Sequence, residues 1–344
     1  MRRLTIKDVA EIAGVSTSTV SRVLSDSPLV SDDTRKKVLK VVRELNFSPN
    51  VVARALKKRE SSTIGLLVPD IVNPYFAEIA RGVEDIAHKS GYSVVLCNYD
   101  ADTEKEKKYL QVLLQRQIDG LIYAGSGLLA GSIVNLLQAG IPTVLLDRDT
   151  SEILDVDTVC IDDESAAQLA VDHLISLGHR EIAVLSGPEY LNSSRGRLAG
   201  YKLSLARSAI DFKPELVVSG PFTTEAGFEL VTKLVRSGAR FTAVFAMSDM
   251  MAIGAIKGLQ RLNLRVPEDI AVVGFDNIKM SELITPELTT VAQPMYELGS
   301  QAFAILKERL DARHSERQRI VLKTRLIVRD SCGANLRTDK LSLA

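Results

Sequence analysis

The chain of 344 residues is poor in the residues that build disulfide frameworks and metal sites. Its three cysteines, Cys97, Cys160 and Cys332, are odd in number, far apart and in no CxxC spacing, so neither a disulfide framework nor a zinc site is predicted. No apolar run approaches the length of a membrane span, and Arg2-Arg3 leads straight into an amphipathic pattern rather than a signal peptide. We therefore expect a cytoplasmic protein with no membrane partner, no metal and no cofactor.

Sequence signatures of catalysis are missing as well. No G-x-S-x-G occurs, and no H-x-x-x-H or H-E-x-x-H spacing relates the four histidines, His88, His173, His179 and His314. The glycines of segment 125–131 miss the dinucleotide-binding spacing, and we interpret the segment as a flexible loop. We therefore expect a protein that is not an enzyme. Turnover of a bound sugar would argue against this expectation.

A net charge of zero conceals two halves of opposite sign. Residues 1–60 hold 13 Lys and Arg against 7 Asp and Glu, which leaves 30 against 36 for the rest of the chain. The length suggests two or three domains, and 46% hydrophobic residues suffice for a real core. A basic head on an acidic body is typical of a nucleic-acid-binding module joined to a sensor, although a chance cluster of surface lysines would look similar.

The basic head begins with a predicted helix-turn-helix over residues 5–24. Thr5 and Asp8 have capping-box spacing, and Gly14 ends the first helix. Ser16 is a plausible N-cap for the second helix. The apolar stripes of the two helices are Ile6, Val9, Ala10 and Ala13, then Val20, Val23 and Leu24. An outer face of small hydroxyls and one Arg suits the DNA major groove, whereas two solvated helices of a small bundle are the plainer alternative. The candidate DNA contacts are Thr5, Ser16, Thr17, Ser18, Thr19, Ser21 and Arg22.

Residues 31–61 contain a third helix and a short basic segment. Ser31 is expected to cap the third helix, with Asp32 and Asp33 in its first turn. Ser48-Pro49-Asn50 then supplies a cap and a proline at the first helical position, and segment 51–59 follows, which is too short to be a stable helix alone in water. A flexible basic linker and a helix that forms on binding are both compatible with it.

From residue 63 on, short apolar runs alternate with amphipathic helices. The runs are 64–68, 93–96, 121–124, 143–146, 182–185, 216–218, 243–246 and 271–274. Strict alternation of strand and helix predicts an α/β fold with parallel, doubly wound sheets. Eight such units exceed one compact sheet, so two lobes are expected.

Polar and aromatic residues follow many of these runs, where the carboxyl ends of parallel strands gather ligands. Arg197 is expected to open the helix after the fifth run. Acids, amides and a guanidinium group beside aromatic rings suit a polyhydroxylated ring, although each residue alone is better read as an ordinary cap or loop residue. The candidate effector contacts are Asn73, Tyr75, Phe76, Asp147, Arg148, Arg197, Phe222, Ser248, Asp249, Asp276 and Gln293.

Several motifs resemble the lac-repressor (LacI/GalR) family. Residues 5–24 fit T-x-x-D-V-A-x-x-A-G-V-S-x-x-T-V-S-R-V-L almost residue for residue. Further motifs are N-P-[YF]-F at 73–76, L-D-R at 146–148, G-R-x-x-G-[YF] at 196–201, S-D-x-M-A-x-G-A at 248–255, R-V-P-x-D-[IV]-x-[VL]-[VI]-G-[FY]-D at 265–276 and T-T-V-x-Q-P at 289–294. The resemblance implies a helix-turn-helix domain joined to a two-lobed core like that of periplasmic sugar-binding proteins, with three crossovers and the ligand in the cleft.

The resemblance also implies roles for individual residues. Segment 51–59 would be a hinge helix in which Leu56 wedges into the minor groove, with Asn50, Ala53 and Lys57 near the DNA. The effector set looks closest to that of ribose-type binders. Two departures are Ser248, where those binders carry Asn, and the hydroxyl of Tyr75, where they carry Phe.

These features predict an effector-controlled transcriptional regulator, in particular a repressor. The expected partners are a pseudo-palindromic double-stranded DNA operator, a small molecule and a second copy of the chain, paired through helix 75–90 and the helix after Thr103. A monosaccharide such as ribose is the first choice of effector, and a purine or nucleoside corepressor is the alternative. The expected domains are 1–47 for DNA binding, 48–61 for the hinge, 62–331 for the core and 332–344 for a tail, with an N-lobe of about 62–160 and 293–322 and a C-lobe of about 161–292 and 323–331.

Overall fold

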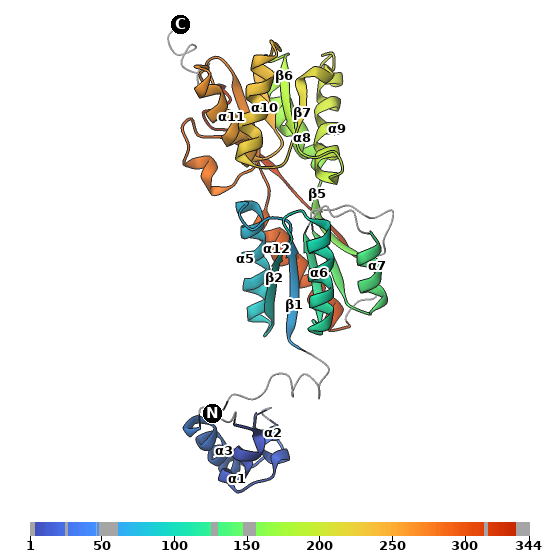
Figure 1. Cartoon of the computed structure of the whole chain (residues 1–344), viewed down its shortest axis with the longest axis vertical. Helices are drawn as coiled ribbons and strands as arrows, with labels where there is room; N and C mark the ends of the chain where they lie inside the picture. Colours follow the sequence, from blue (N-terminus) through green and yellow to red (C-terminus); the bar gives the residue numbers. More distant parts are fainter. Residues whose placement is uncertain are drawn as a thin grey trace. The chain divides into compact units, whose positions relative to one another are not determined.

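The chain consists of two compact units, Met1–Ser62 and Thr63–Ala344 (Figure 1). The computed structural model describes residues 4–24, 27–45, 47, 61–124, 130–146, 156–312 and 316–334. The hinge candidates Asn50, Ala53, Leu56 and Lys57 lie outside these ranges. Within the described ranges, no helix combines the length and the apolar character that crossing a bilayer requires.

The described part of the first unit contains three helices, α1 (Ile6–Ala13), α2 (Thr17–Leu24) and α3 (Asp32–Glu44). Their predicted apolar stripes meet in one small core, whose buried members are Val9, Ala10, Ala13, Val20, Val23, Val38, Val41 and Phe47. The carboxylate of Asp8 accepts hydrogen bonds from both the backbone N–H and the hydroxyl of Thr5, which fixes the start of α1. Gly14 ends α1 with a left-handed φ of 60°, which favours glycine. The helix-turn-helix is therefore confirmed.

The N-lobe is the first half of the second unit and is built on a six-stranded parallel sheet. The strand order is β11-β5-β4-β3-β1-β2. Its strands are β1 (Thr63–Val68), β2 (Ser93–Asn98), β3 (Gly120–Ala124), β4 (Thr143–Leu146), β5 (Asp157–Ile161) and β11 (Arg319–Leu322). Its helices are α5 (Pro74–Lys89), α6 (Thr103–Gln115), α7 (Ala130–Gln138) and α12 (Met295–Leu310). Alternate strand residues face opposite ways, so Leu66 packs in the cluster that includes α5 and α12, whereas Leu67 packs in the cluster that includes α6.

The C-lobe repeats this plan with one antiparallel edge. Its sheet has the order β12-β10-β9-β8-β6-β7, and only the pairing of β10 with β12 is antiparallel. Its strands are β6 (Ile182–Ser186), β7 (Val217–Ser219), β8 (Ala243–Ala246), β9 (Ala271–Asp276), β10 (Thr289–Ala292) and β12 (Arg325–Ile327). Its helices are α8 (Asp163–Ser176), α9 (Asn192–Arg207), α10 (Thr224–Arg236) and α11 (Asp249–Arg261), with short 3-10 turns at η1 (Pro214–Leu216) and η2 (Lys279–Glu282).

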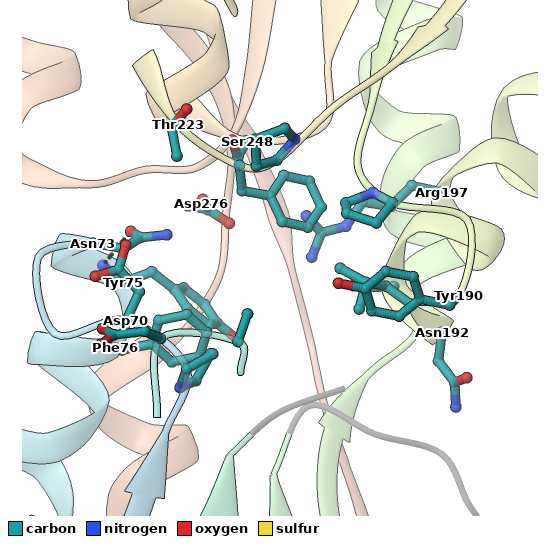
Figure 2. A pocket seen from close by; sticks show the side chains of 18 of the residues that line it. Asp70, Asn73, Tyr75, Phe76, Tyr190, Asn192, Arg197, Thr223, Ser248 and Asp276 are labelled. Carbon is teal, nitrogen blue, oxygen red and sulfur yellow. Dashed lines mark hydrogen bonds between the residues drawn. The ribbon is translucent and has the colours of Figure 1, made fainter. Parts of the chain in front are cut away.

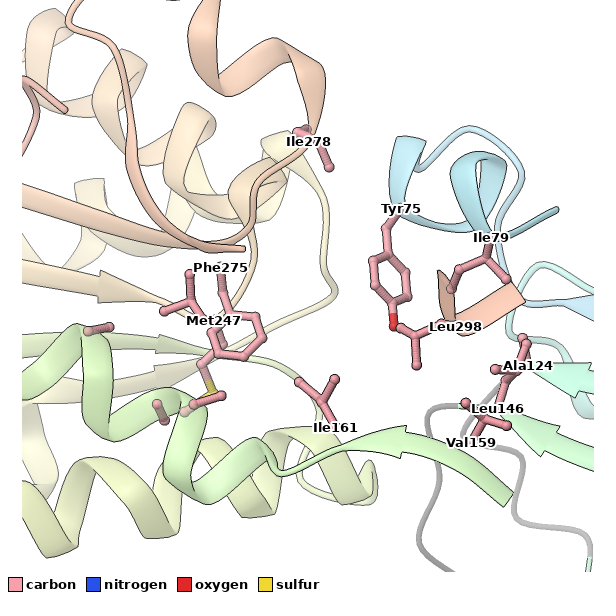
Figure 3. Close-up of a cluster of buried hydrophobic side chains, with 14 of the residues drawn as sticks. Tyr75, Ile79, Ala124, Leu146, Val159, Ile161, Met247, Phe275, Ile278 and Leu298 are labelled. Carbon is pink, nitrogen blue, oxygen red and sulfur yellow. The ribbon is translucent and has the colours of Figure 1, made fainter. Parts of the chain in front are cut away.

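Three crossovers join the lobes. The chain passes from β5 to the C-lobe, returns after β10 to α12, and crosses once more between β11 and β12. One apolar cluster contains residues of both lobes. Figure 3 shows Val159 beside Leu146 and Ala124, whereas Ile161, two residues later on β5, lies toward Met247 and Phe275. The first crossover thus begins inside packed core.

The predicted fold class is confirmed: an all-α head and two doubly wound sheets. Four strands, β5, β10, β11 and β12, have no counterpart among the predicted apolar runs. The expected start of a tail at residue 332 is wrong, because Cys332 is buried in the core and Ala334 packs against it. The helix after the fifth run begins at Asn192, so Arg197 lies in its second turn rather than at its start.

Candidate functional site

A cavity of about 390 Å³ lies in the second unit, between residues of the N-lobe and residues of the C-lobe. Figure 2 shows Asp70, Tyr75 and Phe76 on one side of it, with Arg197, Tyr190 and Thr223 on the others. Most of its walls come from segments that follow the carboxyl ends of β1, β2, β6, β7, β8 and β9. This is the edge at which ligands bind to open parallel sheets.

The first turn of α5 supplies the N-lobe wall. The side chain of Asn73 caps this helix by accepting from the backbone N–H of Tyr75 at 3.0 Å, and Pro74 occupies the first helical position. The rings of Tyr75 and Phe76 meet edge to face with centroids 4.9 Å apart. Cap, proline and ring contact together fix two aromatic side chains against the cavity.

A chain of hydrogen bonds joins this wall to the C-lobe. The Tyr75 hydroxyl donates to Oε1 of Gln293 at 3.3 Å, and Nε2 of Gln293 donates to Oδ1 of Asp276 at 2.7 Å. All three residues are buried and line the cavity. Asp276 ends β9 with a φ of 127°, and Gln293 follows β10 at the second crossover. A backbone conformation that L residues rarely adopt is thus held at this wall.

Arg197 provides the cationic side of the cavity although only 3% of it is exposed. Its Nε donates to Oδ1 of Asp163 at 2.8 Å, and its Nη1 donates to the carbonyl oxygen of Met247 at 2.6 Å. The guanidinium carbon lies 3.8 Å from the centre of the Phe275 ring. Buried charge is costly without such partners, so the position of Arg197 is tightly determined.

Two C-lobe residues complete the wall. Ser248 is the N-cap of α11, since its hydroxyl oxygen accepts from the backbone N–H of Met251 at 3.2 Å. Its hydroxyl proton is still able to donate. The ring of Phe222 packs so closely on Gly187 that any Cβ there would overlap it. Glycine at position 187 therefore lets this ring lie against the cavity.

Asp249 does not line the cavity, which corrects the expectation that it binds an effector. It is fully buried and accepts hydrogen bonds from the Thr290 hydroxyl at 2.5 Å and from the backbone N–H of Ile278 at 2.9 Å. Burial raises the pKa of Asp249 to about 6, although these hydrogen bonds act in the opposite direction. Asp249 connects α11 to β10 and to the segment after β9.

Eight candidate effector residues line the cavity together: Asn73, Tyr75, Phe76, Arg197, Phe222, Ser248, Asp276 and Gln293. Asp147 and Arg148 lie outside the residues that the structure describes. The candidate set missed Asp70, Asp100, Tyr190, Asn192, Ser193 and Thr223, which also line it. Asp70 and Asp100 follow β1 and β2, so the rule that pointed to Asp276 also pointed to them. Nothing comparable marks Tyr190, which belongs to the loop before α9.

In the first unit, α2 carries most of the candidate DNA contacts. Thr17, Ser18 and Arg22 are exposed, whereas Thr19 and Ser21 are half-buried. The Ser16 hydroxyl lies 2.7 Å from that of Ser18 and 2.8 Å from that of Thr19, and its oxygen also accepts from the backbone N–H of Thr19. Ser16 is thus the N-cap of α2, and Thr5 is the N-cap of α1.

Comparison with known proteins identifies both units. Residues 5–50 match the bacterial regulatory proteins of the lacI family, and residues 61–329 match the periplasmic binding proteins and sugar binding domain of the LacI family. The chain belongs to the LacI family. It is a helix-turn-helix transcriptional repressor whose effector domain has the fold of periplasmic binding proteins. The LacI family consists of regulators rather than enzymes.

Repressors that are similar to this chain over nearly their whole length carry different names. The chain is 39% identical to the HTH-type transcriptional repressor PurR of Proteus mirabilis, over 95% of this chain and 96% of that one. It is 38% identical to the ribose operon repressor of Halalkalibacterium halodurans, over 95% and 96%. It is also 38% identical to the repressor CytR of Escherichia coli, over 96% of both chains.

Solved structures agree with this assignment. The lac repressor dimer bound to operator and the anti-inducer ONPF superposes with a TM-score of 0.87 at 31% identity, covering 96% of this chain and 99% of that chain. A LacI-family regulator from Enterococcus faecium with bound ribose gives 0.71 at 36% identity, over 78% and 98%.

Proposed function

We propose that this LacI-family repressor binds a two-fold DNA operator as a homodimer and that an uncharged, polyhydroxylated effector in the cleft sets its operator affinity. A monosaccharide, in particular a pentose such as ribose, is the effector that the cleft supports best. The observation that carries this proposal is the composition of the 390 Å³ cavity, in which carboxylates, amides and a guanidinium group stand between aromatic rings.

The charges of the cavity favour a neutral ligand rich in hydroxyls. Asp70, Asp100 and Asp276 line it, and the positive charge of Arg197 is already compensated by Asp163. Carboxylates accept hydrogen bonds from hydroxyls and repel phosphate groups. Phe76 and Phe222 offer flat apolar faces for the C–H surface of a sugar ring. The ribose-bound relative at 36% identity and the ribose operon repressor at 38% are consistent with this choice.

A purine or nucleoside acting as corepressor is the second candidate. The similarity to the repressors named PurR and CytR favours it, and the same aromatic rings would stack on a base. The ribose portion of a nucleoside would use the same carboxylates. Ligand binding to the purified protein therefore has to discriminate between the two classes.

A homodimer is supported by exposed apolar side chains on the second unit. Ile71, Val72 and Leu96 are 48%, 77% and 47% exposed on the N-lobe, and Met280 and Leu283 are 47% and 69% exposed on the C-lobe. Large exposed apolar groups are typical of interfaces. The two-fold operator needs two copies of α2, because one recognition helix reads a half-site. Sedimentation equilibrium should give a dimer, and V72E should weaken it.

The proposed coupling links two sites through a two-state dimer. Effector closes the cleft, the N-lobes shift at their interface, and the two hinge segments move into or out of the helical pairing that grips the minor groove. Whether the effector raises or lowers operator affinity depends on which of the two states of the dimer it prefers.

A ligand panel tests the proposal. Thermal unfolding of the full chain is followed with ribose, other monosaccharides, nucleosides and purine bases, because ligands that bind the native state raise the unfolding temperature. Isothermal calorimetry then gives the affinity of each ligand that stabilises. We expect stabilisation by ribose above the other sugars. Stabilisation by purine bases alone would favour the second candidate, and no stabilisation by any member would contradict both.

A further inference from the structure

Arg197 is held by Asp163, a residue that does not itself line the effector cavity. Neighbours from four segments surround the guanidinium: Asp163 at the start of α8, the carbonyl of Met247 after β8, the ring of Phe275 in β9 and, farther away, the ring of Phe222. Among these four, Asp163 carries the opposite charge. It therefore offsets part of the cost of burying the cation.

Two glycines bring α9 close enough for this contact. A Cβ at position 196 would lie 2.8 Å from Cβ of Asp163, and a Cβ at position 200 would overlap the carbonyl oxygen of Glu164. The two glycines of the G-R-x-x-G motif are thus required by the close packing of α9 on α8. Gly196 and Gly200 let the backbone of α9 press on the first turn of α8, and Arg197 between them reaches Asp163.

Asp163 lies where the chain enters the C-lobe. Strand β5 of the N-lobe ends at Ile161, Asp162 caps α8, and Asp163 is the first residue of that helix. Arg197 therefore has the effector cavity on one side and the first crossover on the other. Any displacement of the guanidinium by an effector acts directly on the residue that begins α8.

We propose that Asp163 is a positioning residue, which aims Arg197 into the effector cavity and ties it to the first crossover. The proposal rests on the effector site proposed above, because Arg197 is the group through which Asp163 acts. A merely structural ion pair would stabilise the fold without changing how tightly effector binds.

A double-mutant cycle distinguishes these roles. D163A is compared with wild type, and D163A/R197K is compared with R197K, using ribose as the calorimetric probe. We expect D163A to weaken ribose binding at least about tenfold in the wild-type background and less than about twofold beside R197K, because lysine cannot reproduce the fork of arginine. Equal losses in both backgrounds would overturn the proposal.

The neighbouring aspartate is a matched control. Asp162 accepts hydrogen bonds from the backbone N–H and the hydroxyl of Ser165, whereas Asp163 accepts from Nε of Arg197. D162A removes the cap of α8 and should lower the unfolding temperature without changing ribose affinity more than about twofold. A tenfold loss of affinity in D162A would show that any disturbance of α8 suffices, which contradicts a specific role for Asp163.

A measurement without ligand separates this proposal from the identity of the effector. The Nε–H proton of Arg197, assigned in arginine-labelled protein with R197K, should exchange slowly with water in wild type because Asp163 accepts it. We expect the signal to be lost or fast-exchanging in D163A and retained in D162A. An unchanged signal in D163A would overturn the positioning role even if ribose binds. If no sugar binds, the effector proposal fails while this measurement still decides the role of Asp163.

Discussion

The hydroxyl of Tyr75 on the N-lobe donates to Oε1 of Gln293 at the second crossover, across 218 positions of sequence. Nε2 of Gln293 in turn donates a hydrogen bond to Oδ1 of Asp276 of the C-lobe. Both lobes therefore meet in one buried polar chain at the wall of the effector cavity. A ligand that hydrogen-bonds to any member competes with or completes this chain, so occupancy of the cavity bears on how the lobes are held.

Removing the Tyr75 hydroxyl should destabilise the second unit slightly. Y75F leaves Oε1 of buried Gln293 without this donor, and we expect a loss of about 1 kcal/mol in the free energy of unfolding, measured with urea. Y296F is the matched control, because the Tyr296 hydroxyl donates to Asp85 at an exposed position. A loss in Y296F as large as that in Y75F would contradict a special role for the buried chain.

Asp276 should be the strongest single contributor to effector affinity among the described acids. D276N keeps an acceptor for Gln293 but loses the charge that a sugar hydroxyl would meet, so we expect ribose affinity to fall roughly 10- to 100-fold. D172N is the control, since Asp172 pairs with Arg207 on the surface of the C-lobe. Calorimetry measures both variants, and ribose affinity unchanged in D276N would show that the cavity is not the effector site.

Stability should depend on pH through Asp249. Its pKa of about 6 in the folded protein lies above the ordinary aspartate value, so the folded state binds this proton more tightly than the unfolded state does. The resulting stabilisation is present at low pH and is lost as pH rises through 6. Between pH 5 and pH 8 we expect a loss of about 1 kcal/mol in wild type relative to D249N, measured by urea unfolding.

Asp269 provides the control for this titration. Hydrogen bonds from Arg265 lower the pKa of Asp269 to about 2, so D269N should leave the profile between pH 5 and pH 8 unchanged. Parallel profiles of wild type and D249N would mean that Asp249 stays charged throughout this range.

Leu56 should matter more for specific than for non-specific DNA binding. On the family resemblance its side chain wedges into a central base step, which non-specific duplex does not accommodate in the same way. L56A is therefore expected to weaken operator binding at least tenfold while changing non-specific affinity less than threefold, measured by fluorescence anisotropy at fixed salt. Equal losses on both duplexes would argue against a wedge.

Much of the fold was predictable because local rules and global packing agree. The stripes of α1 and α2, the Thr5 and Asp8 cap and the turn at Gly14 all lie within a few residues of one another. The apolar runs of β1, β4, β8 and β9 are likewise predicted from a few consecutive residues. Strand β5 was missed because its sequence, Asp157–Ile161, mixes polar and apolar residues. Its polar first residue, Asp157, has a partner far along the chain, Arg309, which donates to the Asp157 carboxylate through two nitrogens.

The cavity was most readily predictable where a polar residue closes a strand or directly follows it. Asp276 and Gln293 satisfy that rule, and they do line the cavity. Asp249 comes shortly after β8, as the first residue of α11, but the first turn of this helix directs it into the core toward Thr290. Sequence spacing does not distinguish a carboxylate that faces a cleft from one that faces a neighbouring strand, because this depends on the helix direction after the loop.

The most direct test of the account is operator affinity measured with and without a ligand that fills the cleft. A two-fold operator is selected from a pool of near-palindromic duplexes with a central C-G step, and its binding to the full chain is followed by fluorescence anisotropy at fixed salt. We predict that saturating ribose changes operator affinity at least about fivefold, and that D276N needs at least tenfold more ribose for the same change. Operator affinity that stays constant while calorimetry shows the cleft to be filled would contradict the account.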